Sequence, residues 1–405
     1  MKQALISKSQ TAYIYLNSTV RFRAVHPLAE RTIPDMVKAK FEFFENFWAG
    51  DGPFPILFST PHAARGKFYL RYDLVQQHGD VEKLLEESLL QAAPHLDLID
   101  DGIPVVRADL GTTLLPSGLG LEIVVQPELQ PWVKAHLTRE AVRELPALLR
   151  PDDILRNEVR LALKFYRLFF ERQKARAIPP EIFPYLPDTQ GVFDLSHIIR
   201  GQEIFVELLD DPEFVLLLQQ RSLELYLAAT ALFKKGIGEG TNAMVHGHGM
   251  PAGTWFPDTG TRISEDSCTL ISPAMLKKFC IPFIRKAVEP FGRAFLHFCG
   301  QHDRFLEMVC EMELISTLNL GNPEKNDLEG LFALLGKTGT AYLGVIPAQE
   351  AEDLSVYLER VAELTLRHKA RLILVSALHP ADIEEKKKAV KSWHKLTLNP
   401  RGYFR

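Results

Sequence analysis

The chain has few cysteines, no long apolar run and no strong bias toward one sign of charge. Its 405 residues include four cysteines, all between positions 268 and 310, and carry a formal net charge of −4. Such balanced charge argues against a general nucleic-acid or membrane-surface binder. No apolar run approaches the roughly 20 residues of a transmembrane helix, and residues 1–13 lack the apolar core of a secretory signal. We therefore expect a cytoplasmic protein whose thiols are buried, catalytic or metal-binding rather than paired in disulfides.

The sequence also contains no internal repeat and no low-complexity segment. Its composition, with 46% hydrophobic and 24% charged residues, is that of a globular protein. A chain of 405 residues is long enough for a large barrel with an added cap, or for two domains. Amphipathic helical patterns at 33–50 and 80–96 predict that residues 1–95 form an N-terminal helical extension or cap.

From about residue 100 the pattern changes to short apolar runs that alternate with helical stretches. The clearest helices are expected at 211–236 and at 272–292, where Pro282 should kink the helix. Alternating strands and helices indicate a parallel sheet, and this many repeats predict an α/β protein with a (β/α)8 TIM barrel over residues 96–405. The first and second barrel strands are not recognisable. Strands are expected at 103–111, 184–191, 242–249, 294–300, 314–322, 340–347 and 371–380.

Polar residues follow several of these expected strands, where a barrel places its functional site. In "AFLHFCG" (294–300), His297 and Cys299 lie two residues apart, so both side chains should face the same side of a strand. Imidazole and thiolate are preferred zinc ligands, and Gly300 would let the backbone turn away. The spacing also fits a small buried cysteine beside a hydrogen-bonded core histidine. Further polar residues at strand ends are Asp188, Gln190, His246, His248, Asn319, Asn322, Ser376 and His379.

The segments "FLHFCG" (295–300), "NLGNP" (319–323) and "YLGVIP" (342–347) together resemble the uroporphyrinogen decarboxylase superfamily. Residues 115–133, 191–220 and 270–292 are similar to further family segments, so the resemblance covers most of 90–395. The arginine signature of true uroporphyrinogen decarboxylases is not found. The His-x-Cys pair makes the chain closest in motif to the corrinoid-linked zinc methyltransferase branch.

For this branch, the resemblance implies an enzyme that moves a methyl group between a small substrate and a corrinoid, which is free or held by a separate protein. It implies a zinc ion bound by His297, Cys299 and a later cysteine, which lowers the pKa of a thiol or acts as a Lewis acid. No cysteine follows Cys310, and Ser376 stands where the third ligand would fall. Candidates for the missing ligand are His246, His248, Glu265, Cys268 and His379.

The segment 245–273 stands where these methyltransferases carry a shorter acidic loop. Trp255 and Phe256 could form a lid over an apolar or aromatic substrate, or the loop could be a rigid surface cover. Glu265 and Asp266 could be a metal ligand and its hydrogen-bonding partner, or charges at a helix N-terminus. We assign substrate binding to Trp255, Phe256, Arg262 and Asn319, and catalytic roles to Asp188, His248 and Asp266.

Two other functions compete with methyl transfer. A metal-free decarboxylase or other lyase of the same superfamily would use Asp109 or Asp188 to stabilise a protonated intermediate, and Arg107 and Arg262 to hold substrate carboxylates. A non-catalytic binder of a corrinoid or another small molecule would account for the missing third cysteine. The resemblance also implies a homodimer, which no pattern in the sequence requires.

Overall fold

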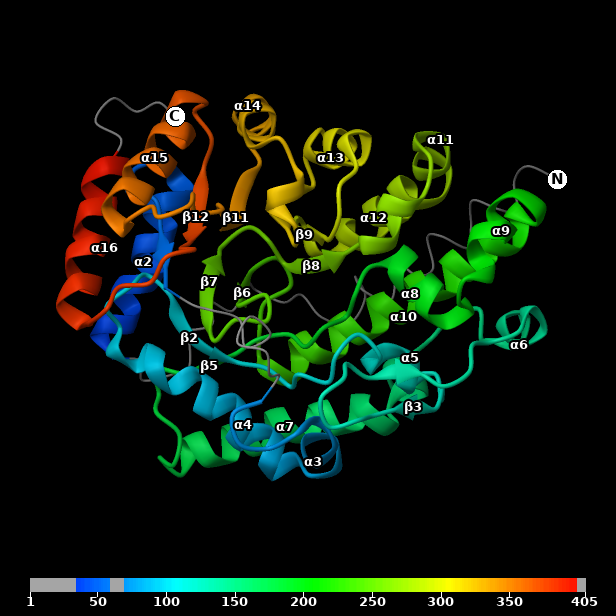
Figure 1. Ribbon diagram of the computed structural model, residues 1–405. Coiled ribbons are helices and arrows are strands. Elements are labelled where there is room, and N and C mark those ends of the chain that lie inside the picture. The colour runs from blue at the N-terminus through cyan, green and yellow to red at the C-terminus, as the bar shows by residue number, and fades with distance from the viewer. Residues whose placement is uncertain (1–33, 59–68, 399–405) are drawn as a thin grey trace.

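The computed structural model describes residues 34–58 and 69–398 (Figure 1). No helix in these two ranges combines the length and the apolar character needed to cross a membrane. The helices expected at 33–50, 80–96 and 211–236 are present as α2, α4 and α10. Within the described part of the first 240 residues, the α-helices are α2 (Asp35–Ala49), α3 (Leu74–Gly79), α4 (Val81–Ala92), α5 (Leu114–Gly118), α6 (Arg139–Glu144), α7 (Asn157–Lys174), α8 (Val192–Arg200), α9 (Glu203–Asp210) and α10 (Pro212–Ile237).

A six-stranded parallel sheet forms one side of the fold, in the order β1-β12-β11-β10-β9-β8. Its strands are almost entirely buried, as expected for a sheet with both faces covered, although β8 and β10 carry several polar side chains. The crossover helices α13 (Asp303–Cys310), α14 (Leu328–Thr338) and α15 (Leu354–Arg367) lie along its outer side with α16 (Ile383–Thr397) (Figure 1). The strands are β1 (Ile56–Leu57), β8 (Thr261–Ser264), β9 (Ala294–Phe298), β10 (Ile315–Leu320), β11 (Ala341–Val345) and β12 (Leu372–Val375).

A second sheet has four strands in the order β5-β2-β7-β6. Strand β2 pairs in parallel with β5 and antiparallel with β7, which in turn pairs antiparallel with β6. A small separate hairpin joins β3 (Ile123–Val124) to β4 (Trp132–Val133). The strands of the four-stranded sheet are β2 (Ile103–Val106), β5 (Phe183–Pro184), β6 (Met244–His246) and β7 (Ala252–Phe256).

The seven strands expected from the sequence each overlap an observed strand. Five observed strands lie outside the expected ranges: β1, which has only two residues, β3 and β4 of the small hairpin, and β7 and β8, which lie in the segment 245–273 that we assigned to a loop. The structure therefore shows an α/β protein with a six-stranded parallel sheet. Its hydrogen bonds join the strands into separate sheets, and closure into a (β/α)8 barrel stays a prediction.

The expected helix at 272–292 is interrupted near Pro282. It consists of α11 (Pro273–Met275), a π-helical turn (Leu276–Cys280) and α12 (Ile281–Val288). Proline has no backbone N–H to bond the preceding turn, which accounts for the change of hydrogen-bonding pattern just before Pro282, whereas a kink of the helix axis stays a prediction.

The described part of the N-terminal segment 1–95 is joined to the main sheet through β1. Ile56 and Leu57 of β1 pair with Leu374 and Val375 of β12, more than 300 residues later. Helix α16 covers this junction, because the indole Nε1–H of Trp393 donates to the carbonyl oxygen of Phe54 at 2.8 Å. The boundary between an extension and a barrel at residue 95 stays a prediction, but β1 is part of the six-stranded sheet.

Trp393 is fully buried, so its replacement by alanine should leave a large cavity under α16 and an unpaired Phe54 carbonyl. We expect Trp393→Ala to lower the free energy of unfolding by about 3–5 kcal/mol, measured by urea denaturation. The control is Ile383→Ala in the same helix, at a side chain that is 56% exposed. A similar decrease in the free energy of unfolding in both variants would show that Trp393 does not hold α16 in place.

Candidate metal centre

Strand β9 carries His297, and Cys299 follows the strand directly. In the sheet, His297 lies between Ser264 of β8 and Asn319 of β10. Gly300 then takes a positive φ of 94°, so the backbone turns away immediately after the cysteine. The Cys299 Sγ and the His297 Nε2 are 3.4 Å apart. The His-x-Cys pair therefore converges at the carboxyl end of β9, as its spacing predicts.

Asn319 fixes which nitrogen of His297 faces the cysteine. The Asn319 Nδ2 donates to the backbone carbonyl of Leu343 at 2.5 Å, so its Oδ1 must point the other way, toward His297. That oxygen lies 2.6 Å from the His297 Nδ1, which must therefore carry the proton. The lone pair of Nε2 therefore faces Cys299, whose Sγ lies within hydrogen-bonding distance. In metal sites, a histidine commonly donates one ring N–H to an oxygen acceptor and binds the metal through the other nitrogen. The contact between Asn319 and His297 has this form.

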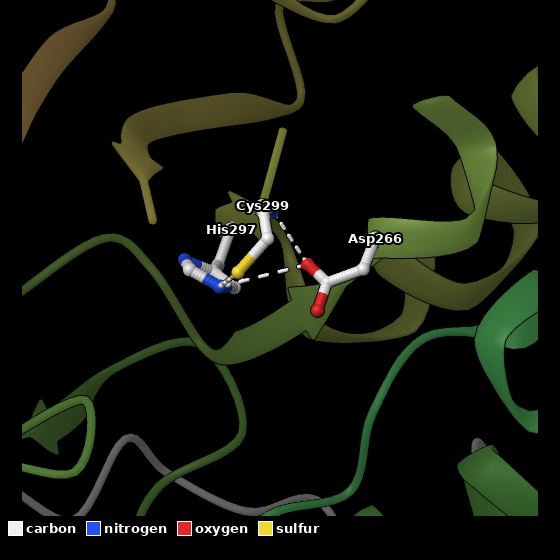
Figure 2. Close-up of side chains that lie close together, drawn as sticks. All are labelled: Asp266, His297 and Cys299. Atoms are coloured by element: carbon white, nitrogen blue, oxygen red, sulfur yellow. Dashed lines mark hydrogen bonds and ion pairs between the residues drawn. The ribbon is translucent and has the colours of Figure 1, made fainter. Parts of the chain in front are cut away.

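Asp266 completes the cluster from the segment after β8 (Figure 2). Its Oδ1 accepts the backbone N–H of Cys299 at 2.6 Å and lies 3.6 Å from the His297 Nε2. One ligand atom from each of Asp266, His297 and Cys299 lies within 4.8 Å of the others. The side chain of Asp266 is 45% exposed, whereas that of His297 is 12% exposed. The cluster is therefore reachable from solvent on the aspartate side.

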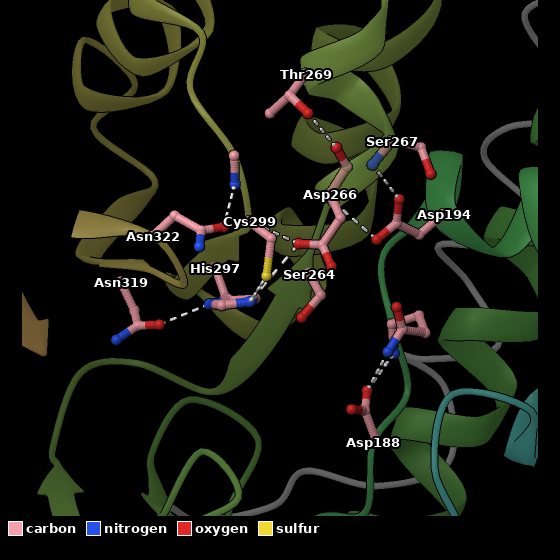
Figure 3. A network of polar contacts seen from close by, with 12 residues as sticks. Asp188, Asp194, Ser264, Asp266, Ser267, Thr269, His297, Cys299, Asn319 and Asn322 are labelled. Carbon is pink, nitrogen blue, oxygen red and sulfur yellow. Dashed lines mark hydrogen bonds and ion pairs between the residues drawn. The ribbon is translucent and has the colours of Figure 1, made fainter. Parts of the chain in front are cut away.

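Two buried carboxylates, Asp194 and Glu265, hold the Asp266 segment in place, and Figure 3 shows the contacts of Asp194. The Asp194 carboxylate of α8 accepts the backbone N–H groups of Asp266 at 2.8 Å and Ser267 at 2.7 Å. In return, the Glu265 carboxylate accepts the N–H groups of Val192, Phe193 and Asp194 at the start of α8. Each carboxylate thus caps the helical turn that carries the other.

Burial is the main influence on the pKa values of Asp194 and Glu265. It raises the pKa of Asp194 to about 7, and the neighbouring charge of Asp266 adds to the rise. Burial and the charge of Asp194 likewise raise the pKa of Glu265 well above its usual range. The oxygens of Glu265 are occupied by α8, and the structure does not bring Glu265 into the cluster, although it is one of the ligands expected from the sequence.

Cys299 is a neutral thiol, not a thiolate, near neutral pH. Burial, and then the negative charge of Asp266, raises its pKa to about 12. Burial lowers the pKa of His297, so the imidazole is neutral at physiological pH. A neutral imidazole is the ligand form of histidine, and the thiol becomes a thiolate as a metal binds and displaces its proton.

His246 and His248, two further ligand candidates from the sequence, lie next to this centre but outside it. His246 in β6 is fully buried, and His248 follows the strand with a positive φ of 47°. The ring of His248 packs against that of His297 at 4.3 Å between centroids, and both His246 and His248 pack against Phe295. Burial, and then neighbouring positive groups, lowers the pKa of both histidines well below the usual value.

Asp188 forms a buried ion pair with Arg262 of β8. Its carboxylate also accepts a hydrogen bond from the Gln190 Nε2 at 2.7 Å, and Arg262 donates to the Ser264 hydroxyl as well. Burial raises the pKa of Asp188, but the charges of Arg262 and Arg107 outweigh burial and hold the pKa at about 2. Asp188 is therefore a permanent anion near neutral pH.

Trp255 and Phe256, which we expected to cover a substrate, lie in the core. Both are on β7 and at most 2% exposed. Trp255 packs against Phe41 of α2 at 5.3 Å, and Phe256 packs against Trp48 of the same helix at 5.4 Å. Because the segment 245–273 folds into two strands rather than an open loop, these rings bind α2 to the sheet instead of forming a lid.

The remaining ligand candidates, Cys268 and His379, do not join the cluster. Ser376 lies at the end of β12, where its hydroxyl donates to the Leu378 carbonyl at 2.6 Å. Cys268 and Cys280 are buried, and desolvation raises the pKa of each thiol. Among the residues described, the cluster of potential ligands consists of Asp266, His297 and Cys299 alone. The aspartate that we expected to be catalytic thus lies where a third ligand would be needed.

Sequence reasoning gave Asn319 a substrate-binding role and missed Asp194 and Gly321. Asn319 hydrogen-bonds His297, and Asp194 supports Asp266. A Cβ built on Gly321 would lie 2.4 Å from the Cys299 Sγ and 3.1 Å from the His297 Cε1. The signal in the sequence for Asn319 and Gly321 is the "NLGNP" segment itself, which places an asparagine near the end of β10 and a glycine directly after the strand.

Comparisons with known proteins support the fold. No protein-family model matches the chain, and no curated protein sequence matches it. A solved structure, a methyltransferase from Methanosarcina mazei, is similar over 89% of this chain and 98% of its own, with a TM-score of 0.57 and 14% sequence identity. At this identity the likeness shows that the two chains share a fold.

A substitution at Gly321 tests whether zinc binding needs the open space beside the side chains of Cys299 and His297. Gly321→Ala should displace the Cys299 Sγ and weaken zinc binding at least about tenfold, by analogy with other residues that orient metal ligands. The affinity is measured by competition with a chromophoric chelator. The control is Gly79→Ala, at a glycine where an added methyl group would meet no atom within 4 Å. Unchanged zinc affinity in Gly321→Ala would contradict this geometry.

Asp188 should make stability depend on pH. The pKa of Asp188 is depressed in the folded protein. Its contribution to the free energy of unfolding is therefore complete above the pKa of aspartate in the unfolded chain, near 4, and is lost as the pH falls through about 2. We expect Asp188→Asn to be less stable than the natural protein by about 2 kcal/mol at pH 6, with the difference narrowing toward pH 2.5. Asp109→Asn, at a half-exposed carboxylate, is the control. If the natural protein and Asp188→Asn differed in stability by the same amount at pH 6 and at pH 2.5, the ionised Asp188 would not be the source of the pH dependence.

Proposed function

We propose that the protein is a zinc-dependent methyltransferase-like enzyme that moves a methyl group between a small substrate and a corrinoid. The observation that carries the proposal is the convergence of Asp266, His297 and Cys299 at the carboxyl end of β9. The likeness of the fold to a chain described as a methyltransferase gives it further support.

The chemistry of the donor set fits zinc. An imidazole nitrogen, a thiolate and a carboxylate oxygen are all zinc ligands, and three protein ligands leave a fourth position for a substrate, as in catalytic zinc sites. The proton on the His297 Nδ1 is already bound by Asn319, which leaves Nε2 for a metal. The absence of a side chain at Gly321 leaves the cysteine sulfur its space.

Each residue of the centre has a defined task in this proposal. A bound zinc ion would lower the pKa of a substrate thiol or polarise an ether oxygen. His297 and Cys299 would hold it from β9, and Asn319 would keep the imidazole in the required tautomer. Asp266 would provide the third ligand from the exposed side, where a substrate can approach. Asp194 would keep Asp266 in position through the backbone of its turn.

The partners follow from the same proposal. The corrinoid would be free or would arrive on a separate protein, and it would meet the centre at the carboxyl ends of the parallel strands. We propose in addition that the two sheets are the parts of a (β/α)8 barrel. A homodimer and a cytoplasmic location belong to the proposal as well.

The runner-up is a metal-free lyase that acts on a carboxylated substrate. It is supported by the buried Arg262 and Arg107 beside Asp188, since guanidinium groups recognise carboxylates. The two proposals differ in their products. Methyl transfer from methylcobalamin to a panel of small thiols is followed by the absorbance of the cobalamin, whereas a lyase would release carbon dioxide from a carboxylated substrate without a metal.

The metal content gives the first test. We expect protein purified without added metal to contain about one zinc ion per chain, and Cys299→Ser to lose it, because the thiolate is one of only three protein ligands. Elemental analysis measures both. The matched control is Cys310→Ser, at a buried cysteine on α13 outside the cluster, which should keep the metal. Zinc retained by a folded Cys299→Ser, or no zinc in the natural protein, would overturn the proposal.

A further inference from the structure

A cleft of about 620 Å³ lies outside the metal centre, between the helices α3, α5 and α7 and the segment that contains β3. This volume is in the usual range of clefts that bind small molecules. Figure 1 shows these elements in the lower part of the view, below β8 and β9, which position the metal centre. The cleft is therefore a candidate for a second binding site, which the proposed methyl transfer does not use.

Part of the cleft surface is apolar. Leu121, Ile123 and Val125 all line it, and because they alternate along β3 and its neighbouring residues, their side chains share one face. Leu161 of α7 also lines the cleft. Among the described residues that line it, none is aromatic. An apolar surface that offers no ring for stacking favours an aliphatic chain over a flat ring system.

Helix α7 adds positive charge to the cleft. Arg160 and Lys164 both line it, and because they lie four residues apart, they are on one face of the helix. The Arg160 Nη2 donates to the backbone carbonyl of Leu155 at 2.9 Å. Within the described residues, neither cation forms an ion pair with a carboxylate. The excess charge extends along the chain, since residues 134–176 contain eleven lysines and arginines but six acids, in a protein of net charge −4.

The two acids that line the cleft already have partners. Glu122 pairs with Lys134 at 2.7 Å, and the Glu158 Oε1 lies 3.0 Å from the His78 Nδ1. The side chain of His78 also lines the cleft and is only 8% exposed, yet its Nε2 has no hydrogen-bond partner in the described part of the chain. Buried polar atoms are normally hydrogen-bonded, so a polar atom from outside the chain is expected beside this nitrogen.

We propose that this cleft binds a small aliphatic carboxylate, a saturated chain that ends in one negative charge. Arg160 and Lys164 bind the carboxylate, because they are the cations of the cleft that no acid neutralises, and the His78 Nε2 provides a further polar contact. The aliphatic chain lies against Leu121 and Ile123. Binding requires neither a metal nor any residue of the metal centre, so this site does not depend on the proposed methyl transfer.

The test is isothermal titration calorimetry of the full-length protein with three probes. These are octanoate, octanol, which has the same chain without the charge, and acetate, which has the charge without the chain. Octanoate should bind saturably, and octanol and acetate should each bind about tenfold more weakly or less, because each lacks one half of the recognised molecule. Equal binding of octanoate and octanol would mean that the cleft takes up apolar molecules regardless of charge, and the proposal would be wrong.

A pair of double variants locates the site. Arg160→Met with Lys164→Met removes two exposed charges, so the protein should fold, bind octanoate about tenfold more weakly and bind octanol as before. The matched control is Arg167→Met with Lys174→Met, two exposed cations of the same helix that do not line the cleft, which should leave octanoate binding unchanged. Equal octanoate affinity in the two double variants would contradict the proposal.

The variant Cys299→Ser separates this cleft from the metal centre. It should bind octanoate with the affinity of the natural protein, whether or not zinc is present, because Cys299 does not line the cleft. That result would support the carboxylate site even if the methyltransferase proposal fails. Loss of octanoate binding in a folded Cys299→Ser would place octanoate at the metal centre and overturn the assignment to this cleft.

Discussion

The candidate centre depends on the reciprocal capping of two helical turns by buried carboxylates. Glu265 binds the first N–H groups of α8, and Asp194 of α8 binds the N–H groups of Asp266 and Ser267. Neither acid could be buried without these donors, since a buried carboxylate needs hydrogen bonds or a counter-charge. Because the caps lock the turn after β8 against α8, the Asp266 side chain is held over the end of β9, where its oxygen reaches Cys299.

The sequence was sufficient for the parts of the site that lie close together along the chain. Alternation on a strand predicts that His297 and Cys299 share a face, and the structure brings the two side chains to 3.4 Å. The strands that carry the centre and its supporting asparagine, β9 and β10, were also predictable from their apolar runs bounded by glycine. These features require only local periodicity, which a single sequence contains.

The remaining parts depend on contacts between distant segments, which a single sequence does not contain. Asp266 meets Cys299 across 33 positions, and Asn319 meets His297 through the register of two neighbouring strands. Glu265 and Asp266 are adjacent acids of similar length, yet one caps a helix and the other faces the cysteine. Composition also misled us at Trp255, because an aromatic side chain in a glycine-rich segment resembles a lid until its packing against α2 is known.

The pairing of β1 with β12 has a consequence for how the protein is made. Ile56 leaves the ribosome more than 300 residues before its partner Leu374. Until then β1 has no neighbour in the sheet, and β11 presents an open edge that could pair with another chain. Contacts between such distant residues form slowly. The nascent chain therefore passes through a long interval in which the edge of β11 is open to pairing with other chains, before β12 and β1 complete the six-stranded sheet.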